Sequence, residues 1–168
     1  LASLSELGYI VEWRIINAAD YGMPQRRRRV FIMGYHKDSP IHSKIMSSDP
    51  KGWILEKGTL AKAFNINLDK VSHNNEFDIH GKLWEITDNF NKEAKSSPFQ
   101  NNGIMIDKKV YTSKVYPNYD GPKKTLGDVL LPEDKVSEKF YINGELERWR
   151  YLKGAKKEKR FNKKRNFS

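Results

Sequence analysis

Cysteine is absent from the 168-residue chain. A framework of disulfide bonds is therefore excluded, and so is any reaction in which the chain itself supplies a thiolate nucleophile. Histidine is scarce as well. The four histidines, His36, His42, His73 and His80, lack the close spacing of metal ligands, so the sequence predicts no metal site.

Long apolar runs are missing too. No stretch approaches the roughly 20 apolar residues of a membrane-spanning helix, and the first residues lack a secretory pattern. We therefore expect a soluble protein of the cytoplasm. Hydrophobic residues make up only 38% of the chain, but four Trp, eight Tyr and eight Phe favour one modest folded domain with an appendage.

Basic charge is concentrated at one end of a chain whose net charge is +10. Residues 148–168 hold ten Lys or Arg and a single acidic residue, Glu158. Such a segment neutralises phosphates and releases counterions, which gives affinity for nucleic acid without sequence specificity. A solvated, mobile end is the alternative that charge alone leaves open. The residues expected to contact phosphates are Lys153, Lys156, Lys157 and Arg160.

A helix is predicted over residues 145–153, at the start of this basic segment. Leu146, Trp149 and Leu152 recur at intervals of three, and Gly154 is placed to end the helix. This helix would present basic residues to a nucleic acid.

Four consecutive arginines, Arg26 to Arg29, lie between two apolar stretches, Tyr9–Ile16 and Val30–Tyr35. Both stretches are rich in the β-branched and aromatic residues typical of strands, and Gly22 and Pro24 interrupt them. The pattern predicts two neighbouring strands with the arginines at the start of the second.

Side chains on a strand alternate between its two faces. Arg27 and Arg29 are therefore expected to point one way and Arg26 and Arg28 the other, so that one pair can face a site while the other meets solvent or phosphate. The alternative is a surface cluster that adds solubility or binds polyanions without specificity.

The run from Asn17 to Ile32 resembles the Gln-x-Arg-x-Arg motif of DNA cytosine-5 methyltransferases, together with the strands that flank it in that family. The resemblance implies that Gln25, Arg27 and Arg29 support the active site, with the last arginine at a cytosine flipped out of double-stranded DNA. Attack on the cytosine ring builds negative charge on the base, which a preorganised guanidinium near its carbonyl oxygen would stabilise. Arginine is suited to this role because it stays charged at any working pH.

The family reaction adds a cysteine to C6 of the flipped base and transfers a methyl group from S-adenosylmethionine to C5. The chain lacks that cysteine, a Glu-Asn-Val segment and a glycine-rich cofactor turn, which the family order of motifs places before Leu1. We therefore expect a partial piece, inactive alone, whose partner is the remainder of the catalytic domain. The cofactor site would lie largely in that remainder.

The resemblance implies an α+β or mixed fold in two parts. Residues 1–38 would hold a helix end and the strand pair, as terminal strands of a Rossmann-like methyltransferase sheet. Residues 39–168 would form a small, irregular, β-rich target-recognition domain with short helices. His36–Gly52, which is polar and contains Pro40 and Pro50, is the expected crossing between these parts.

Two short helices and a hairpin are predicted in the second part. Thr59 is expected to cap a helix through Phe64, and apolar residues from Ile79 to Phe90 recur at intervals of four and three, which predicts a helix packed on the core. The hairpin would join residues 104–106 and 110–116 through a turn at 107–109.

The hairpin is the expected place for reading bases. Thr112, Ser113 and Lys114 could reach base edges in the major groove, although an ordinary solvent face is the alternative. Thr125-Leu126-Gly127-Asp128 resembles the segment that closes the variable region in the family, which would place the recognition residues before Thr125.

Other functions remain open at this point. The chain could be a separately encoded subunit of a split methyltransferase, a non-catalytic DNA-binding module, or part of an RNA methyltransferase of the same superfamily. The resemblance to this family implies a prokaryotic or phage-encoded protein at the nucleoid, of the kind found in restriction-modification systems. The isolated strand pair would expose a sheet edge and invite self-association.

Overall fold

The computed structural model describes residues 1–89, 92, 97–141 and 144–152. The chain divides into two compact units, Leu1–Val129 and Leu130–Ser168. No helix of the described residues is long and apolar enough to cross a membrane.

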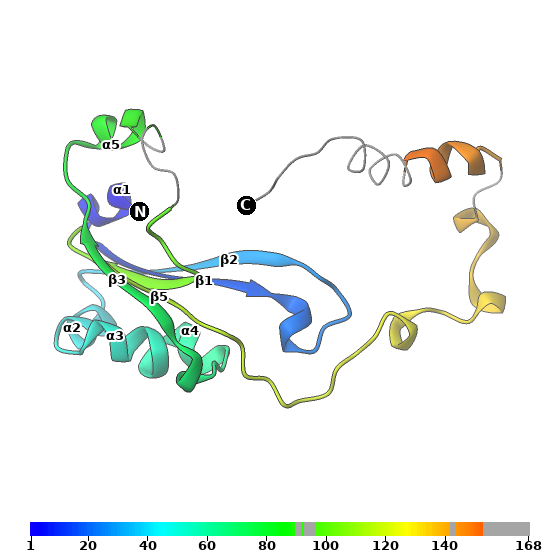
Figure 1. Cartoon of the computed structure of the whole chain (residues 1–168), viewed down its shortest axis with the longest axis horizontal. Helices are drawn as coiled ribbons and strands as arrows, with labels where there is room; N and C mark the ends of the chain where they lie inside the picture. Colours follow the sequence, from blue (N-terminus) through cyan, green and yellow to red (C-terminus); the bar gives the residue numbers. More distant parts are fainter. Residues whose placement is uncertain (90–91, 93–96, 142–143, 153–168) are drawn as a thin grey trace. The chain divides into compact units, whose positions relative to one another are not determined.

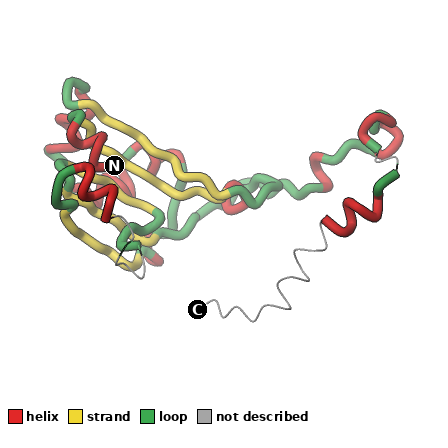
Figure 2. The backbone as a smooth tube through the Cα atoms, turned by 90° about the horizontal axis from the view of Figure 1, so that it is seen from above, coloured by secondary structure: helices red, strands yellow, loops and turns green. Residues whose placement is uncertain are grey.

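The first unit is built on a five-stranded sheet in the order β2-β1-β4-β5-β3, in which every neighbouring pair is antiparallel (Figures 1 and 2). The strand bounds are β1 Tyr9–Asn17, β2 Arg28–His36, β3 Ser72–Asp78, β4 Asn102–Ile106 and β5 Lys109–Lys114. The fold is thus mixed, with short helices beside an antiparallel sheet. The predicted domain boundary between residues 38 and 39 stays a prediction. The sheet spans this position, because β1 before it pairs with β4 after it.

Short helices cover both faces of the sheet. In Figure 1, α2, α3 and α4 lie on one side, whereas α1 and α5 lie on the other. The α-helical bounds are α1 Ala2–Glu6, α2 Pro40–Met46, α3 Pro50–Gly52, α4 Thr59–Ala63 and α5 Leu83–Asn89. The other helical turns are η1 Ala18–Tyr21, η2 Trp53–Lys57, η3 Leu68–Lys70, η4 Gly127–Val129, η5 Glu133–Lys135 and η6 Glu138–Phe140.

Two apolar clusters fill the space between the sheet and its covering segments. On the side of α2 and η2, the cluster contains Ile10, Tyr35, Ile45, Trp53, Ile54 and Ile104. On the side of α1, the cluster contains Val11, Trp13, Met105 and Val110, with Leu4 packed against it. Alternating residues of β1 therefore contribute to opposite faces, as the period of a strand requires.

The predicted strand pair is confirmed, and its arginine positions are refined. Arg28 and Arg29 belong to β2, whereas Arg26 and Arg27 precede it. The predicted hairpin is also confirmed as β4 and β5. Its turn residues Asp107 and Lys108 have φ of 47° and 64°, the left-handed pair that suits a two-residue hairpin.

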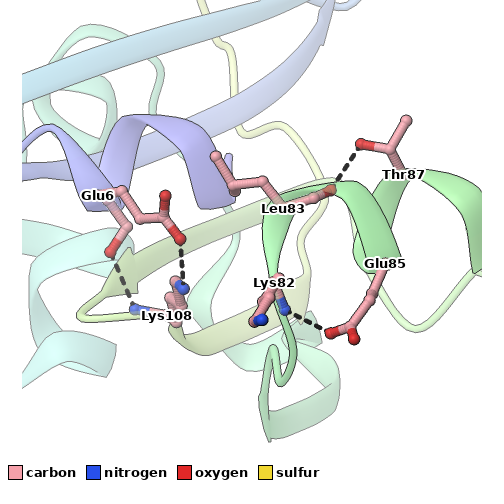
Figure 3. A network of polar contacts seen from close by, with 7 residues as sticks. Glu6, Lys82, Leu83, Glu85, Thr87 and Lys108 are labelled. Atoms are coloured by element: carbon pink, nitrogen blue, oxygen red, sulfur yellow. Dashed lines mark hydrogen bonds and ion pairs between the residues drawn. The ribbon is translucent and has the colours of Figure 1, made fainter.

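The hairpin turn is tied to the first helix (Figure 3). Lys108 Nζ lies 2.8 Å from Glu6 Oε1, and the Lys108 N–H donates to Ser5 Oγ at 3.2 Å. Gly8, in the left-handed region with φ of 83°, follows α1 and leads into β1. The expected helix end before the first strand is therefore confirmed.

Two helix predictions need correction. The cap of α4 is Gly58 and makes no side-chain hydrogen bond, whereas Thr59 Oγ1 lies 3.1 Å from the Tyr35 hydroxyl. The α5 helix begins at Leu83, four residues later than predicted, and it contributes no buried side chain. Ile79 instead packs on the cluster around Val11, because it follows β3 directly.

The second unit consists of short turns and one helix among its described residues. The helix predicted over residues 145–153 is found over residues 146–152. Arg148 pairs with Glu145 at 3.1 Å, and Arg150 pairs with Glu147 at 3.2 Å. Because all four side chains are largely exposed, these ion pairs contribute little to stability.

Candidate functional site

The connector between β1 and β2 carries the arginine motif and is held closed by backbone hydrogen bonds. The Ala18 N–H donates to the Arg27 carbonyl at 3.1 Å, and the Met23 N–H donates to the Ala18 carbonyl at 3.1 Å. Arg27 N–H donates to the Gln25 carbonyl at 3.0 Å. The motif therefore begins in a turn of defined shape before β2 starts.

Gly22 sits at the tip of this connector, against a distant part of the chain. Its φ is 82°, and a Cβ at this position would meet the Pro122 carbonyl oxygen and lie 2.6 Å from the Tyr119 ring. The Lys124 N–H donates to the Gly22 carbonyl at 2.8 Å. The segment at 119–124 thus covers the connector so closely that only glycine fits.

Aromatic rings brace the residues on both sides of the motif. The Phe64 ring lies 5.3 Å from the Tyr21 ring and 5.4 Å from the Phe31 ring. Tyr21 also packs on Tyr119 at 6.1 Å and donates its hydroxyl to the Asn65 carbonyl at 3.1 Å. Burial raises the pKa of Tyr21 above its usual value. These contacts hold Tyr21 and Phe31 in place, so the motif between them is anchored at both ends.

The register of β1 and β2 places Arg28 and Arg29 on opposite faces. Arg29 pairs with Ile16 and Arg28 pairs with Asn17. Directly opposed residues of an antiparallel pair share a face, so Arg29 lies on the face of Phe31 and Tyr35, which α2 covers. The predicted alternation is therefore confirmed for these two residues.

The motif side chains are open to solvent, and Arg29 Nη1 donates a hydrogen bond to the neighbouring Arg28 carbonyl at 2.7 Å. Gln25 and all four arginines are exposed. In the described part of the chain, none of the four guanidinium groups lies within ion-pair distance of a carboxylate. Four unpaired cations on a braced connector are a surface suited to an anionic or electron-rich ligand.

Arg14 is a buried arginine that the sequence analysis did not identify. It is 1% exposed, and its Nη1 donates to the carbonyls of Leu60 and Phe64 at 3.0 and 2.7 Å. Its Nη2 donates to the Ile54 carbonyl, and its Nε donates to Asn102 Oδ1 at 3.0 Å. Burial lowers the pKa of Arg14, which Tyr21 and Glu12 partly offset. Arg14 therefore fixes the end of α4, from which Phe64 reaches the motif.

A second buried polar group joins β1 to β2 and η2. Glu12 is fully buried, and its Oε2 accepts hydrogen bonds from the Tyr35 hydroxyl at 2.7 Å and from Trp53 Nε1 at 3.1 Å. Burial is the main cause that raises the pKa of Tyr35. A charged residue inside an apolar strand was the only sequence signal for Glu12 and Arg14.

Two predicted base-reading residues are buried. Thr112 and Ser113 are each 2% exposed. Thr112 Oγ1 accepts from the Gln100 N–H at 2.9 Å and donates to the Asn102 carbonyl at 2.7 Å. Because the fold encloses both side chains and that of Thr112 is already hydrogen-bonded within it, these two residues are corrected to a structural role. Lys114 is partly exposed, with Nζ 5.6 Å from the centre of the Tyr116 ring.

The remaining predicted contacts cannot be placed in the fold. Lys153, Lys156, Lys157 and Arg160 lie outside the described residues. The described residues contain no group of three or more acidic or histidine side chains suited to a metal ion.

Comparison with known proteins identifies a family model that matches nearly the whole chain. The family model described as C-5 cytosine-specific DNA methylase matches residues 1–166. The Type II methyltransferase M.Sau3AI of Staphylococcus aureus is 42% identical over 167 residues, which cover 97% of this chain and 38% of that protein.

Shorter matches point the same way. Type II methyltransferase M.DdeI of Desulfomicrobium norvegicum is 45% identical over 61 residues, 36% of this chain and 15% of that protein. M.MthTI of Methanothermobacter thermautotrophicus is 41% identical over 62 residues, 32% of this chain and 19% of that protein. The chain spans less than two fifths of the length of each of these relatives. No solved structure matches it. By the family match and the likeness to M.Sau3AI, the chain belongs to the C-5 cytosine-specific DNA methylase family.

Proposed function

We propose that this chain is the part of a DNA cytosine-5 methyltransferase that positions the flipped base and recognises the DNA target. The observation that carries the proposal is the braced connector, on which Gln25 and the unpaired arginines are exposed. The intact enzyme would flip a cytosine at a specific DNA sequence and methylate its C5.

Arg29 is assigned to the flipped cytosine, with Arg27 and Gln25 beside it. A guanidinium fixed before the reaction starts stabilises charge that develops on the base without reorganising in the transition state. The anchoring of Phe31, two residues after Arg29 on the same face, by Phe64 supports this assignment. Arginine suits the site because its planar donors can meet a carbonyl oxygen directly.

S-adenosylmethionine would supply the methyl group in this reaction. The space at the start of α4 does not fit that cofactor. Gly58 directly precedes α4 and packs against Trp53. A Cβ added at Gly58 would lie 2.7 Å from Trp53 Nε1. The space at this helix start is therefore filled by the chain itself. We assign the cysteine nucleophile to the rest of the enzyme, and the cofactor site largely to it.

The exposed edge of β2 is proposed to pair with that remainder as part of a Rossmann-like sheet. β2 is an edge strand of the described sheet, and its Val30 and Ile32 side chains are more than half exposed. An open edge with apolar side chains promotes association between chains. We expect the isolated chain to self-associate, which sedimentation across a concentration series would test; a monomer at every concentration would contradict it.

The experiment that tests the proposed function uses the purified chain and duplex DNA. The chain alone should bind duplex and transfer no methyl group from labelled S-adenosylmethionine. Methyl transfer should appear on mixing with a separately produced remainder that carries the nucleophile. Incorporation by the chain alone would refute the assignment of the nucleophile to the remainder.

A non-catalytic DNA-binding module is the second candidate, and the absence of cysteine from the sequence favours it. It predicts duplex binding with no activity after mixing. Competition between duplex DNA and structured RNA in the same assay separates both candidates from an RNA-directed enzyme. RNA that displaces the duplex at equal concentration would count against target recognition on DNA.

A further inference from the structure

A small cavity lies beside the arginine motif, on the other side of β1 from the β2 ladder. Its volume is about 160 Å³. β1 continues to Asn17, whereas its pairing with β4 ends at Arg14, so the last residues of β1 have no paired strand on that side in the described sheet. The segment after β5 closes the space, and the side chains that matter here are Asn17, Asp20, Tyr21, Arg28, Lys114 and Tyr116.

Residues with hydrogen-bond donors and residues with acceptors both line the cavity. Asn17 Nδ2 donates to Asp20 Oδ1 at 3.0 Å, but the buried Asn17 Oδ1 accepts no hydrogen bond. Neither Arg28 nor Lys114 forms an ion pair with a described carboxylate. The exposed Asp20 carboxylate adds an acceptor beside these two cations, so the cavity offers both donors and acceptors to a ligand.

The charged, polar and aromatic residues that line the cavity favour some classes of ligand over others. A phosphate offers only acceptors, which would satisfy Arg28 and Lys114 but would meet the like charge of the Asp20 carboxylate. A nucleobase offers donors and acceptors on one edge, and it also has a flat face that stacks on tyrosine. The cavity volume is about that of five water molecules in the liquid, which suits one heterocyclic ring system without its sugar.

We propose that this cavity binds a single unpaired nucleobase of DNA, distinct from the cytosine assigned to Arg29. Arg28 lines the cavity, and the β-ladder places it on the face of β2 opposite to Arg29. Bases held outside a duplex are read in this manner, by polar groups along an edge and aromatic rings on a face. DNA as the source of the base rests on the proposed function, whereas the binding of a base does not.

The test is an NMR titration of the full 168-residue chain, labelled with nitrogen-15, with guanosine and cytidine monophosphates and with deoxyribose 5-phosphate. Either nucleotide should shift the Asn17 side-chain amide and the Lys114 and Tyr116 backbone amides in a saturable manner. Deoxyribose 5-phosphate should not. Equal shifts with the sugar phosphate, or no shifts with either nucleotide, would overturn the proposal.

Variants locate the site. Lys114→Gln should weaken nucleotide binding at least fivefold, and Asn17→Ala should do the same if it folds. Lys109→Gln is the matched control, because Lys109 lies at the other end of β5 and pairs with Glu76 at 2.7 Å. Equal loss in Lys109→Gln and Lys114→Gln would mean general charge attraction and would overturn the assignment.

Duplex binding measured on the same samples separates this proposal from the proposed function. Binding of paired duplex without nucleotide shifts overturns the cavity proposal alone. Nucleotide shifts without duplex binding support a base site and count against the proposed function. A further comparison tests whether the base comes from DNA. A duplex with one unpaired nucleotide should shift the Lys114 and Tyr116 amide signals more than a fully paired duplex does. Equal shifts would overturn DNA as the source of the base.

Discussion

Replacing Gly22 by alanine should detach the segment at 119–124 from the arginine connector. The left-handed conformation of Gly22, with φ of 82°, costs an alanine about 1 to 2 kcal/mol. The new Cβ would also meet the Pro122 carbonyl oxygen and the Tyr119 ring. Forcing neighbouring groups apart costs a further 1 to 3 kcal/mol, roughly, so the free energy of unfolding should fall by about 3 kcal/mol in total.

Gly8 provides the matched control within the same compact unit. Its φ is 83°, but an added Cβ would meet only the flexible Lys37 side chain, with its nearest atom at 3.0 Å. Gly8→Ala therefore keeps the backbone strain and removes most of the steric conflict. Its cost should stay near about 1 to 2 kcal/mol.

Urea unfolding of both variants and hydrogen exchange of the Lys124 amide would measure these effects. The Lys124 N–H is the donor to the Gly22 carbonyl, so its exchange should accelerate in Gly22→Ala and remain slow in Gly8→Ala. Equal stability losses in the two variants, with unchanged Lys124 exchange, would refute the argument that the 119–124 segment packs on the connector.

Two further predictions concern the buried polar groups. Arg14→Met should lower the free energy of unfolding by about 3 kcal/mol in urea titrations, because the carbonyls of Ile54, Leu60 and Phe64 each lose a donor. Ile54 and Leu60 keep one other donor, from Asn102 Nδ2 and the Phe64 N–H. A loss no larger than the roughly 0.5 kcal/mol of a typical surface substitution would contradict the network. The raised pKa of Tyr35 predicts a stability contribution that is complete below the unfolded pKa of about 10 and is lost as pH rises towards the higher folded pKa. Tyr35→Phe should flatten the decline of stability above about pH 10 relative to the wild type, and an unchanged slope in denaturant titrations at several pH values would contradict this.

The elements that could be predicted from sequence are those with strong local signals. The β1 and β2 strands have β-branched and aromatic residues on both sides of Gly22 and Pro24, and the β4 and β5 hairpin has a similar pattern around a short turn. Both were found where expected. In each case the information lies within a few residues, so no distant contact is needed to specify the structure.

The groups that could not be predicted depend on contacts between distant residues. Arg14 is satisfied by carbonyls that lie 40 to 50 residues away, and no side-chain pattern marks a backbone acceptor. Thr112 and Ser113 are polar and resemble surface residues, but the fold buries both, and Thr112 hydrogen-bonds with the Gln100 N–H and the Asn102 carbonyl. Thr59 was misassigned for the same reason, because its neighbour is the Tyr35 hydroxyl of β2.

The most direct test of the central claim is the effect of Arg29→Ala in the intact methyltransferase that we propose contains this chain. Single-turnover methyl transfer should fall on the order of 100-fold, as expected when one stabilising donor is removed, whereas the Kd for duplex DNA should change no more than about threefold. Arg26→Ala removes the same charge before β2 begins and should leave methyl transfer within about threefold. Equal losses of transfer and of duplex affinity in Arg29→Ala would mean that the arginine only holds phosphate, and would contradict the account.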